Sequence, residues 1–285
     1  MKHILLPTDF SNNAWNAITY ALAFFKNEVC SFYILHTYTP SFYRVDYMLG
    51  GPSFSAIPDA GVEASLKGLE KTLKDINKQH TNSKHTFKTL SAFNVLTDEI
   101  NEVVESKRID LIVMGTQGAT GAKDLFIGTN TVHVLRKVKI PVLAVPAGYA
   151  YKEIQKIVFA TDYWTQYKKE EIEPLALIAK MHKAKLIVLH VLEEMGLWEK
   201  QEENKKELTI FLGDIPHSFD QMESKHVADA IQDYMESKQL DLLAMQNRKH
   251  FFWERLLTRQ NVDAIGFHLK VPFLVLRDTG NSTKQ

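Results

Sequence analysis

The chain has 285 residues, of which 45% are hydrophobic and 24% are charged, a composition typical of a globular protein long enough for two domains. Lysine plus arginine and aspartate plus glutamate both number 34, so no overall charge would draw the chain to nucleic acid or to an anionic membrane. The single cysteine, Cys30, excludes an internal disulfide, fits a reducing compartment and lies in an apolar run that favours a buried structural thiol.

The N-terminus enters a predicted strand at His3–Leu6 without a preceding signal-peptide-like segment. No apolar run approaches the length that a bilayer requires, so we expect a cytoplasmic protein without a membrane partner. The last residues, 279–285, are polar and predict a disordered tail.

Apolar runs and helix-like segments alternate through the first 145 residues. Strands are expected near 3–6, 29–36, 87–92, 110–114 and 140–145, and helices near 11–26, 63–79, 97–107 and 130–137. Ser11 or Asn12 is expected to cap the first helix and Thr97 a later one. A loop rich in proline, glycine and aromatic residues, Thr39–Gly61, follows the second strand. The alternation predicts a parallel sheet with helices on both faces.

The sequence then repeats itself after a joint near 148–155. Asp241-Leu-Leu-Ala-Met245 matches Asp110-Leu-Ile-Val-Met114, and 271–275 matches 140–144, both at an offset of 131 positions. Thr161-Asp162 repeats Thr8-Asp9 at an offset of 153, so the second copy lacks 22 residues near its start. We therefore expect two copies of one α/β domain, at 1–148 and 154–278.

A glycine-rich stretch stands between the fourth strand and the helix after it. Gly115 and Gly118 are followed by Gly128 and Thr129, directly before the helix-like segment 130–137. Glycine allows close approach of the backbone to a ligand, and the N-terminus of a helix favours an anion. The arrangement indicates a phosphate site, with ordinary turn glycines as the alternative. Neither a Walker A lysine pattern nor a dinucleotide-binding glycine pattern is present.

At this point the chain resembles the universal stress protein family, as a tandem member. The resemblance rests on Pro7-Thr8-Asp9, on His36 at the end of the second strand, on the glycine signature and on Pro141-Val-Leu-Ala-Val145. It implies five-stranded parallel sheets of strand order 3-2-1-4-5 in both halves. Members that carry the full glycine signature typically bind ATP or a related adenine nucleotide.

The resemblance also implies which residues hold the nucleotide. Thr8 and Asp9 would lie beside the ribose or adenine, and the backbone of Thr37 would meet the adenine edge. Gly115 would approach the ribose and Gly118 the phosphates, with backbone N–H groups closing on the phosphates at Gly128, Thr129 and Asn130. Independently, a carboxylate at the end of the first strand suits ribose hydroxyls at the switch point of an open α/β sheet. Asp9 as a helix cap and Thr129 as an N-cap remain the alternatives.

The second half has lost the glycine signature. At the offset of 131 positions, the three glycines and the threonine of the signature are replaced by Gln246, Lys249, Arg259 and Gln260. We therefore expect the second half not to bind nucleotide in the family's manner. The loop 246–255 mixes basic and aromatic residues, for which packing between the halves is favoured over nucleic-acid binding.

Three functions follow as hypotheses. The first is a stress-response protein that senses or regulates through an unknown protein partner, with an adenine nucleotide, possible Mg²⁺ and no other metal. The second is a slow ATPase, since no residue is an evident general base for efficient hydrolysis. The third is a protein-interaction scaffold without nucleotide. The family resemblance implies that the last strands of the two halves can pair, as last strands commonly do between subunits in this family, and a further homodimer is compatible with the sequence.

Overall fold

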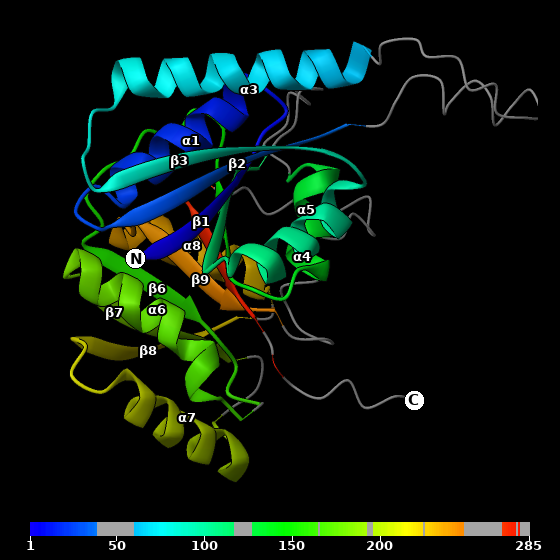
Figure 1. Ribbon diagram of the computed structural model, residues 1–285. Coiled ribbons are helices and arrows are strands. Elements are labelled where there is room, and N and C mark those ends of the chain that lie inside the picture. Colours follow the sequence, from blue (N-terminus) through cyan, green and yellow to red (C-terminus); the bar gives the residue numbers. More distant parts are fainter. Residues whose placement is uncertain are drawn as a thin grey trace, which may run out of the picture.

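The computed structural model describes residues 1–38, 60–116, 127–164, 166–192, 196–224, 226–247, 270–277 and 279. Within these ranges the strands form one ten-stranded sheet of order β3-β2-β1-β4-β5-β10-β9-β6-β7-β8 (Figure 1). Four features expected from sequence lie wholly or mostly outside the described residues: the Thr39–Gly61 loop, the stretch 117–126 with Gly118, the run 248–269, and the tail 279–285 apart from Thr279.

The first half of the chain contributes five strands and four helices to the described fold. In chain order they are β1 (Lys2–Pro7), α1 (Asn12–Phe24), β2 (Cys30–Tyr38), α3 (Ala60–Gln79), β3 (His85–Phe93), α4 (Leu96–Lys107), β4 (Leu111–Gly115), α5 (Thr129–Lys137) and β5 (Val142–Val145). The second half contributes β6 (Lys156–Ala160), α6 (Lys169–His182), β7 (Lys185–Leu192), α7 (Glu199–Leu212), β8 (His217–Glu223), α8 (Val227–Lys238), β9 (Leu242–Gln246) and β10 (Phe273–Leu276).

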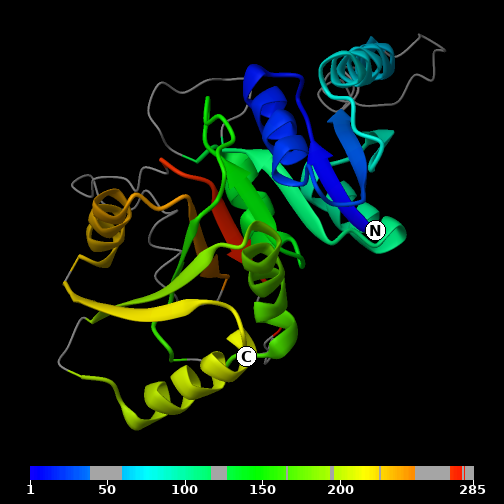
Figure 2. The same cartoon turned by 90° about the vertical axis from the view of Figure 1, so that its left-hand side faces the viewer.

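Both halves have the strand order 3-2-1-4-5, so the fold predicted from the sequence is confirmed. Within each half all strand pairs are parallel. The halves meet where β5 and β10 pair antiparallel, with Leu143 opposite Leu274. Figure 2 shows β10 (red) between β5 (green) and β9 (orange). The expected pairing of the two last strands is therefore confirmed.

The buried side chains form two clusters, one on each face of the sheet. Alternate residues of each strand point to opposite faces, so Ile4 and Leu6 join one cluster and Leu5 joins the other. The first cluster packs under α1, α3, α6 and α7, and the second under α4, α5 and α8. Each cluster runs through both halves without a break. Burial of Cys30 within the first cluster confirms the structural thiol.

Aromatic residues join the halves on the face that carries α1 and α6. The ring of Tyr20 lies 5.5 Å from that of Tyr151, and Phe24 meets His182 edge-on at 4.4 Å. Lys26 and Glu153 form an exposed ion pair above them at 3.4 Å. The N-terminal helices of the two halves are thus packed against each other through α1, α6 and the connection between them.

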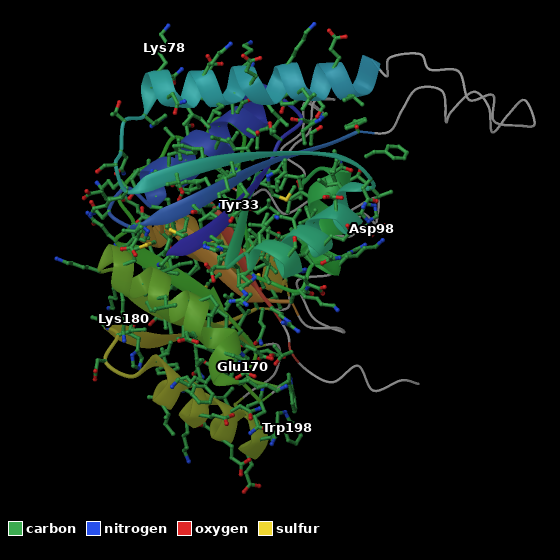
Figure 3. The ribbon with its side chains drawn as sticks, viewed as in Figure 1. Tyr33, Lys78, Asp98, Glu170, Lys180 and Trp198 are labelled. Carbon is green, nitrogen blue, oxygen red and sulfur yellow. The ribbon has the colours of Figure 1, made fainter. Side chains whose placement is uncertain are left out.

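The sequence predicted the N-cap of one helix correctly and that of another wrongly. Ser11 caps α1 as expected, its hydroxyl accepting from the N–H of Ala14 at 3.2 Å. The expectation for Thr97 was wrong: Val95 is the N-cap of α4, and Thr97 is buried in its first turn beside Asp98, which Figure 3 labels. Asp98 and Glu99 place acidic charge at this helix start, which the helix dipole favours. In the described part of the chain, no helix is both long and apolar enough to cross a bilayer.

Candidate functional site

Three strands of the first half end at one edge of the sheet, where the predicted site residues gather. Pro7 lies opposite Leu35 on the neighbouring strand, and Leu5 lies opposite Ile112. This register brings the ends of β1, β2 and β4 to the same level. Thr8, Asp9, Thr37 and Gly115 therefore converge at this edge, with the start of α5 beside them. Of the predicted residues, Gly118 lies outside the described part.

The turn from β1 into α1 fixes the direction of Asp9. The backbone N–H of Thr8 donates to Leu35 O at 2.8 Å, and the Thr8 hydroxyl accepts from the N–H of Phe10 at 3.0 Å. Asp9 Oδ1 accepts from the N–H of Ser11 at 3.0 Å, and its side chain is exposed. Since Ser11 is the helix cap, the alternative that Asp9 caps α1 is wrong. Asp9 instead presents a carboxylate at the open edge.

Thr37 offers main-chain groups to the same edge. In a parallel ladder, the N–H and C=O of one residue face the same neighbouring strand, and successive residues alternate. Leu35 faces β1, because its carbonyl accepts from Thr8. Thr37 lies two residues further and so faces the same side, beyond Pro7, where β1 has ended.

An aromatic stack backs this edge, which the sequence did not reveal. Phe10 has a left-handed backbone (φ 63°), and its ring stacks on His36 at 4.4 Å. The ring also lies against Gly68 of α3, where an added Cβ would stand 2.4 Å from it. Nδ1 of His36 is 2.8 Å from the hydroxyl of buried Ser65. Burial lowers the pKa of His36, and the charge of Asp9 opposes this shift. These contacts favour the structural role expected for His36.

The start of α5 is open to an anion. Gly128 is the N-cap, with φ −64° and ψ 153°, and its N–H donates to Thr116 O at 2.6 Å. Among the described residues, no side chain caps the helix, and its first turn holds no acidic residue. Thr129 and Asn130 are exposed in that turn, where backbone N–H groups have no intrahelical acceptor. The alternative that Thr129 is the N-cap is wrong, since it is the first helical residue.

A hydroxyl that sequence reasoning missed ties α5 to β4. Thr131 is buried, and its hydroxyl donates to Gly115 O at 2.9 Å. This bond holds the first turn of α5 against the end of β4. The sequence carried no sign of it, because a threonine in the first turn of a helix is common in any setting.

Gly115 has a packing reason of its own. A Cβ at this position would lie 3.1 Å from the carbonyl oxygen of Asn13, tighter than ordinary contact. The missing side chain therefore faces α1, whereas the open start of α5 lies on the other face of the sheet. Glycine at this position allows α1 to approach β4 closely.

The corresponding edge of the second half is filled by its own side chains. Gln246, at the position of Gly115, donates to Glu171 Oε2 at 2.5 Å. Glu171 is only 2% exposed, and its Oε1 accepts from the N–H and the hydroxyl of Thr279 at 2.6 and 2.5 Å. Alignment of the C-caps of α1 and α6, at Phe25 and Lys183, places Glu171 at the position of Asn13. A hydrogen-bonded network thus replaces the backbone contact of the first half.

Helix α7 covers the repeated Thr-Asp pair. The backbone carbonyls of Asp162 and Tyr163 accept from the buried amides of Gln201 and Asn204 at 2.7 and 2.6 Å. Tyr163 has the left-handed conformation of Phe10 (φ 59°), yet it is 1% exposed whereas Phe10 is 38% exposed. Lys249, Arg259, Gln260 and the basic and aromatic residues 248–255 lie outside the described part. Within it, no group of three or more His, Cys, Asp or Glu could hold a metal.

Comparisons with known proteins identify the family and the shared fold. A model of the universal stress protein family matches residues 1–146. Universal stress proteins MJ0577 and MJ0531 of Methanocaldococcus jannaschii are 27% identical over 160 residues and 28% identical over 149 residues. Each match covers 50% of this chain, and they cover 94% and 81% of those proteins. The crystal structure of a universal stress protein from Archaeoglobus fulgidus has a TM-score of 0.65 at 18% identity, over 96% of each chain. That structure shares the fold over nearly the whole length.

Proposed function

Because the chain belongs to the universal stress protein family, we propose that it binds an adenine nucleotide, ATP or a close relative, in its first half. One observation carries this proposal. An exposed carboxylate, the main chain of Thr37 and an uncapped helix start meet at one edge of the sheet, at the switch point where open α/β sheets bind ligands.

The residues at this edge fit the parts of a nucleotide. The Asp9 carboxylate suits the ribose hydroxyls as an acceptor, and the Thr37 main chain offers both a donor and an acceptor to an adenine edge. The N–H groups of Thr129 and Asn130 suit the phosphates, with the dipole of α5 behind them and the Thr129 hydroxyl as a further donor. The expected phosphate contact from the Gly128 N–H is not proposed, because this group already donates to Thr116 O. The positive charges of Arg136 and Lys137, in the last turn of α5, interact favourably with the negative end of the helix dipole. We also propose that Gly118 lies beside the phosphates.

The proposal places one nucleotide in each chain. The second half, proposed as a domain over 154–278, covers its Thr161-Asp162 turn with Gln201 and Asn204. The first half, proposed as a domain over 1–148, leaves Asp9 exposed. The family's stress response supports a sensing or regulatory role, in which the bound nucleotide alters a surface that a protein partner reads.

Ligand identification tests the proposal directly. The chain is purified gently, denatured, and the released small molecules are identified by mass spectrometry, with calorimetric titration of ATP, ADP and AMP in parallel. We expect an adenine nucleotide in the first assay and saturable binding in the second. Repeating the titration with and without Mg²⁺ measures whether a metal accompanies the phosphates. Failure of both assays would overturn the proposal.

A matched pair of variants locates the site. Gly128→Arg, which copies Arg259 of the second half, should abolish binding, because a long side chain at the N-cap fills the space that phosphate needs. Arg259→Gly should leave binding unchanged. Unchanged thermal unfolding of Gly128→Arg shows that it is folded, and nucleotide bound by this folded variant would contradict the assigned site. Phosphate release above the background of Gly128→Arg would instead identify a slow ATPase.

A further inference from the structure

A groove separates α1 from α3 on the face of the sheet opposite to α5. It encloses about 260 Å³ and is lined on one side by Phe10, Trp15 and Ile18. Lys71, Asp75 and Gln79 of α3 line the other side. Thr8, Ser11 and Asn12 also line the groove, so aromatic rings and polar groups together face the charged side chains of α3. Thr8 and Phe10 lie between this groove and the proposed nucleotide edge and border both.

Gly68 helps to shape this groove. The Phe10 ring leans on Gly68, so a side chain there would collide with the ring and reach into the same space. At the corresponding turn of the second half, Asn204 of α7 extends to the carbonyl of Tyr163. In the second half, an amide side chain therefore lies at the turn where the first half has Gly68.

The charges on the groove side of α3 are not matched within the helix. Glu63 pairs with Lys67 and Glu70 with Lys74, each at 2.6 Å and at i,i+4 spacing. Lys71 and Asp75 have the same spacing, but neither forms an ion pair with another described residue. Lysine before an acid is the weaker order for such a pair. An ammonium and a carboxylate about one helical turn apart therefore remain available to a ligand. Figure 3 shows Lys78, near the end of the same helix, pointing away from the sheet.

We propose that this groove binds a free α-amino acid with an apolar or aromatic side chain. The ligand's ammonium would pair with Asp75 and its carboxylate with Lys71, since a zwitterion carries both charges within one small molecule. The rings of Trp15 and Phe10 would receive the side chain. At about 30 Å³ per water, the volume equals that of about nine water molecules, which suits leucine or phenylalanine.

Titration with matched analogues tests the charge requirement. L-Phenylalanine and L-leucine are compared with N-acetyl-L-phenylalanine, which lacks the ammonium, and with L-phenylalaninamide, which lacks the carboxylate. We expect saturable binding of the amino acids by calorimetry, a shift of the Trp15 indole resonance, and at least about tenfold weaker binding of both analogues. Absence of saturable amino-acid binding at millimolar concentrations, or equal binding of the analogues, would overturn the proposal.

Variants of α3 assign each charge to its partner. Asp75→Asn should remove the preference for phenylalanine over its N-acetyl form, and Lys71→Gln should remove the preference over the amide. The double variant Glu70→Gln, Lys74→Gln neutralises a pair that closes within the same helix and should leave the affinities unchanged. Equal losses in this control and in the groove variants would show that the amino acid does not bind in the groove. Gly128→Arg should retain amino-acid binding, which separates this result from the proposed nucleotide site.

Discussion

The two halves of the chain share one strand order but treat the same edge of the sheet in opposite ways. In the first half, the turn after β1 leaves Asp9 and Phe10 at the surface. In the second half, α7 supplies Gln201 and Asn204 to the matching turn, and Tyr163 is buried there. Backbone groups at a strand end need partners, and these come either from the chain itself or from water and ligand. In the described residues, the edge is exposed in the first half and covered by α7 in the second, which supports the proposal of a single nucleotide site in the first half.

The structure also distinguishes the roles of Gly115 and Gly128, two glycines of the signature. Gly115 lies against the Asn13 carbonyl, so its small size serves the packing of α1 on β4. Gly128 has a backbone conformation that any residue can adopt. Gly115 thus has a packing reason that holds without a ligand, whereas the backbone angles of Gly128 do not require glycine. The presence of Gly115 therefore gives little support to the proposed phosphate site, which rests on the start of α5.

The largest expected difference between the halves lies at Phe10 and Tyr163. Tyr163→Ala should lower the free energy of unfolding by about 4 kcal/mol, because a fully buried ring is lost. Phe10→Ala should cost about 2 kcal/mol, because the ring is partly exposed. Phe10 and Tyr163 have similar φ values, 63° and 59°, so alanine would be strained to a similar degree at both positions. Urea unfolding of the two variants measures the difference, and equal losses would contradict the closed edge.

The next largest loss of stability is expected at Glu171, the buried carboxylate of the second half. Glu171→Gln should cost about 3 kcal/mol, since its amide group would face donors from Gln246 and Thr279 that now bond to a carboxylate. The neighbouring Glu170, labelled in Figure 3, is exposed and serves as the control. Glu170→Gln should change the free energy of unfolding by less than about 0.5 kcal/mol. A loss at Glu171 no larger than at Glu170 would show that the network does not hold the second half together.

Gly115 and Gly128 should respond differently to one added methyl group. Gly115→Ala should cost about 2 kcal/mol, because the new Cβ crowds the Asn13 carbonyl and α1 has to shift. Gly128→Ala should cost about 1 kcal/mol or less, the loss expected of a weaker N-cap. Thermal or urea unfolding checks the order. The reverse order would mean that Gly128 is the glycine required by the fold.

The remaining effect depends on pH and concerns the junction of the halves. Burial, followed by the charges of Lys2 and Lys26, lowers the pKa of His182 to about 4. The unfolded chain binds a proton at His182 near pH 6.5, whereas the folded chain does not until about pH 4. The stability of the wild type should therefore fall, relative to His182→Gln, as the pH decreases from 6.5 toward 4. Parallel pH profiles of the two proteins would contradict burial of a neutral ring at the junction.

Sequence patterns predicted the layout because the inner strands are short buried runs and the later part of the repeat has a constant offset, whereas β3 and β8 are partly exposed. The family resemblance predicted that β5 and β10 pair. The left-handed turn at Phe10 and the bond from Thr131 to Gly115 were not predictable, because they depend on tertiary contacts. Gln246 was read only as a lost glycine, since its partners Glu171 and Thr279 become neighbours only through the fold. Thr97 failed as a cap because its side chain is buried in the first turn of α4.

Binding stoichiometry tests the asymmetry of the two halves most directly. Calorimetric titration of ATP into the full-length chain, freed of bound ligand, should give one nucleotide per chain, and Gly128→Arg should give none. Two nucleotides per chain would contradict the closure of the second half. Binding that persists undiminished in folded Gly128→Arg, or that is absent from the wild type, would contradict the site assigned to the first.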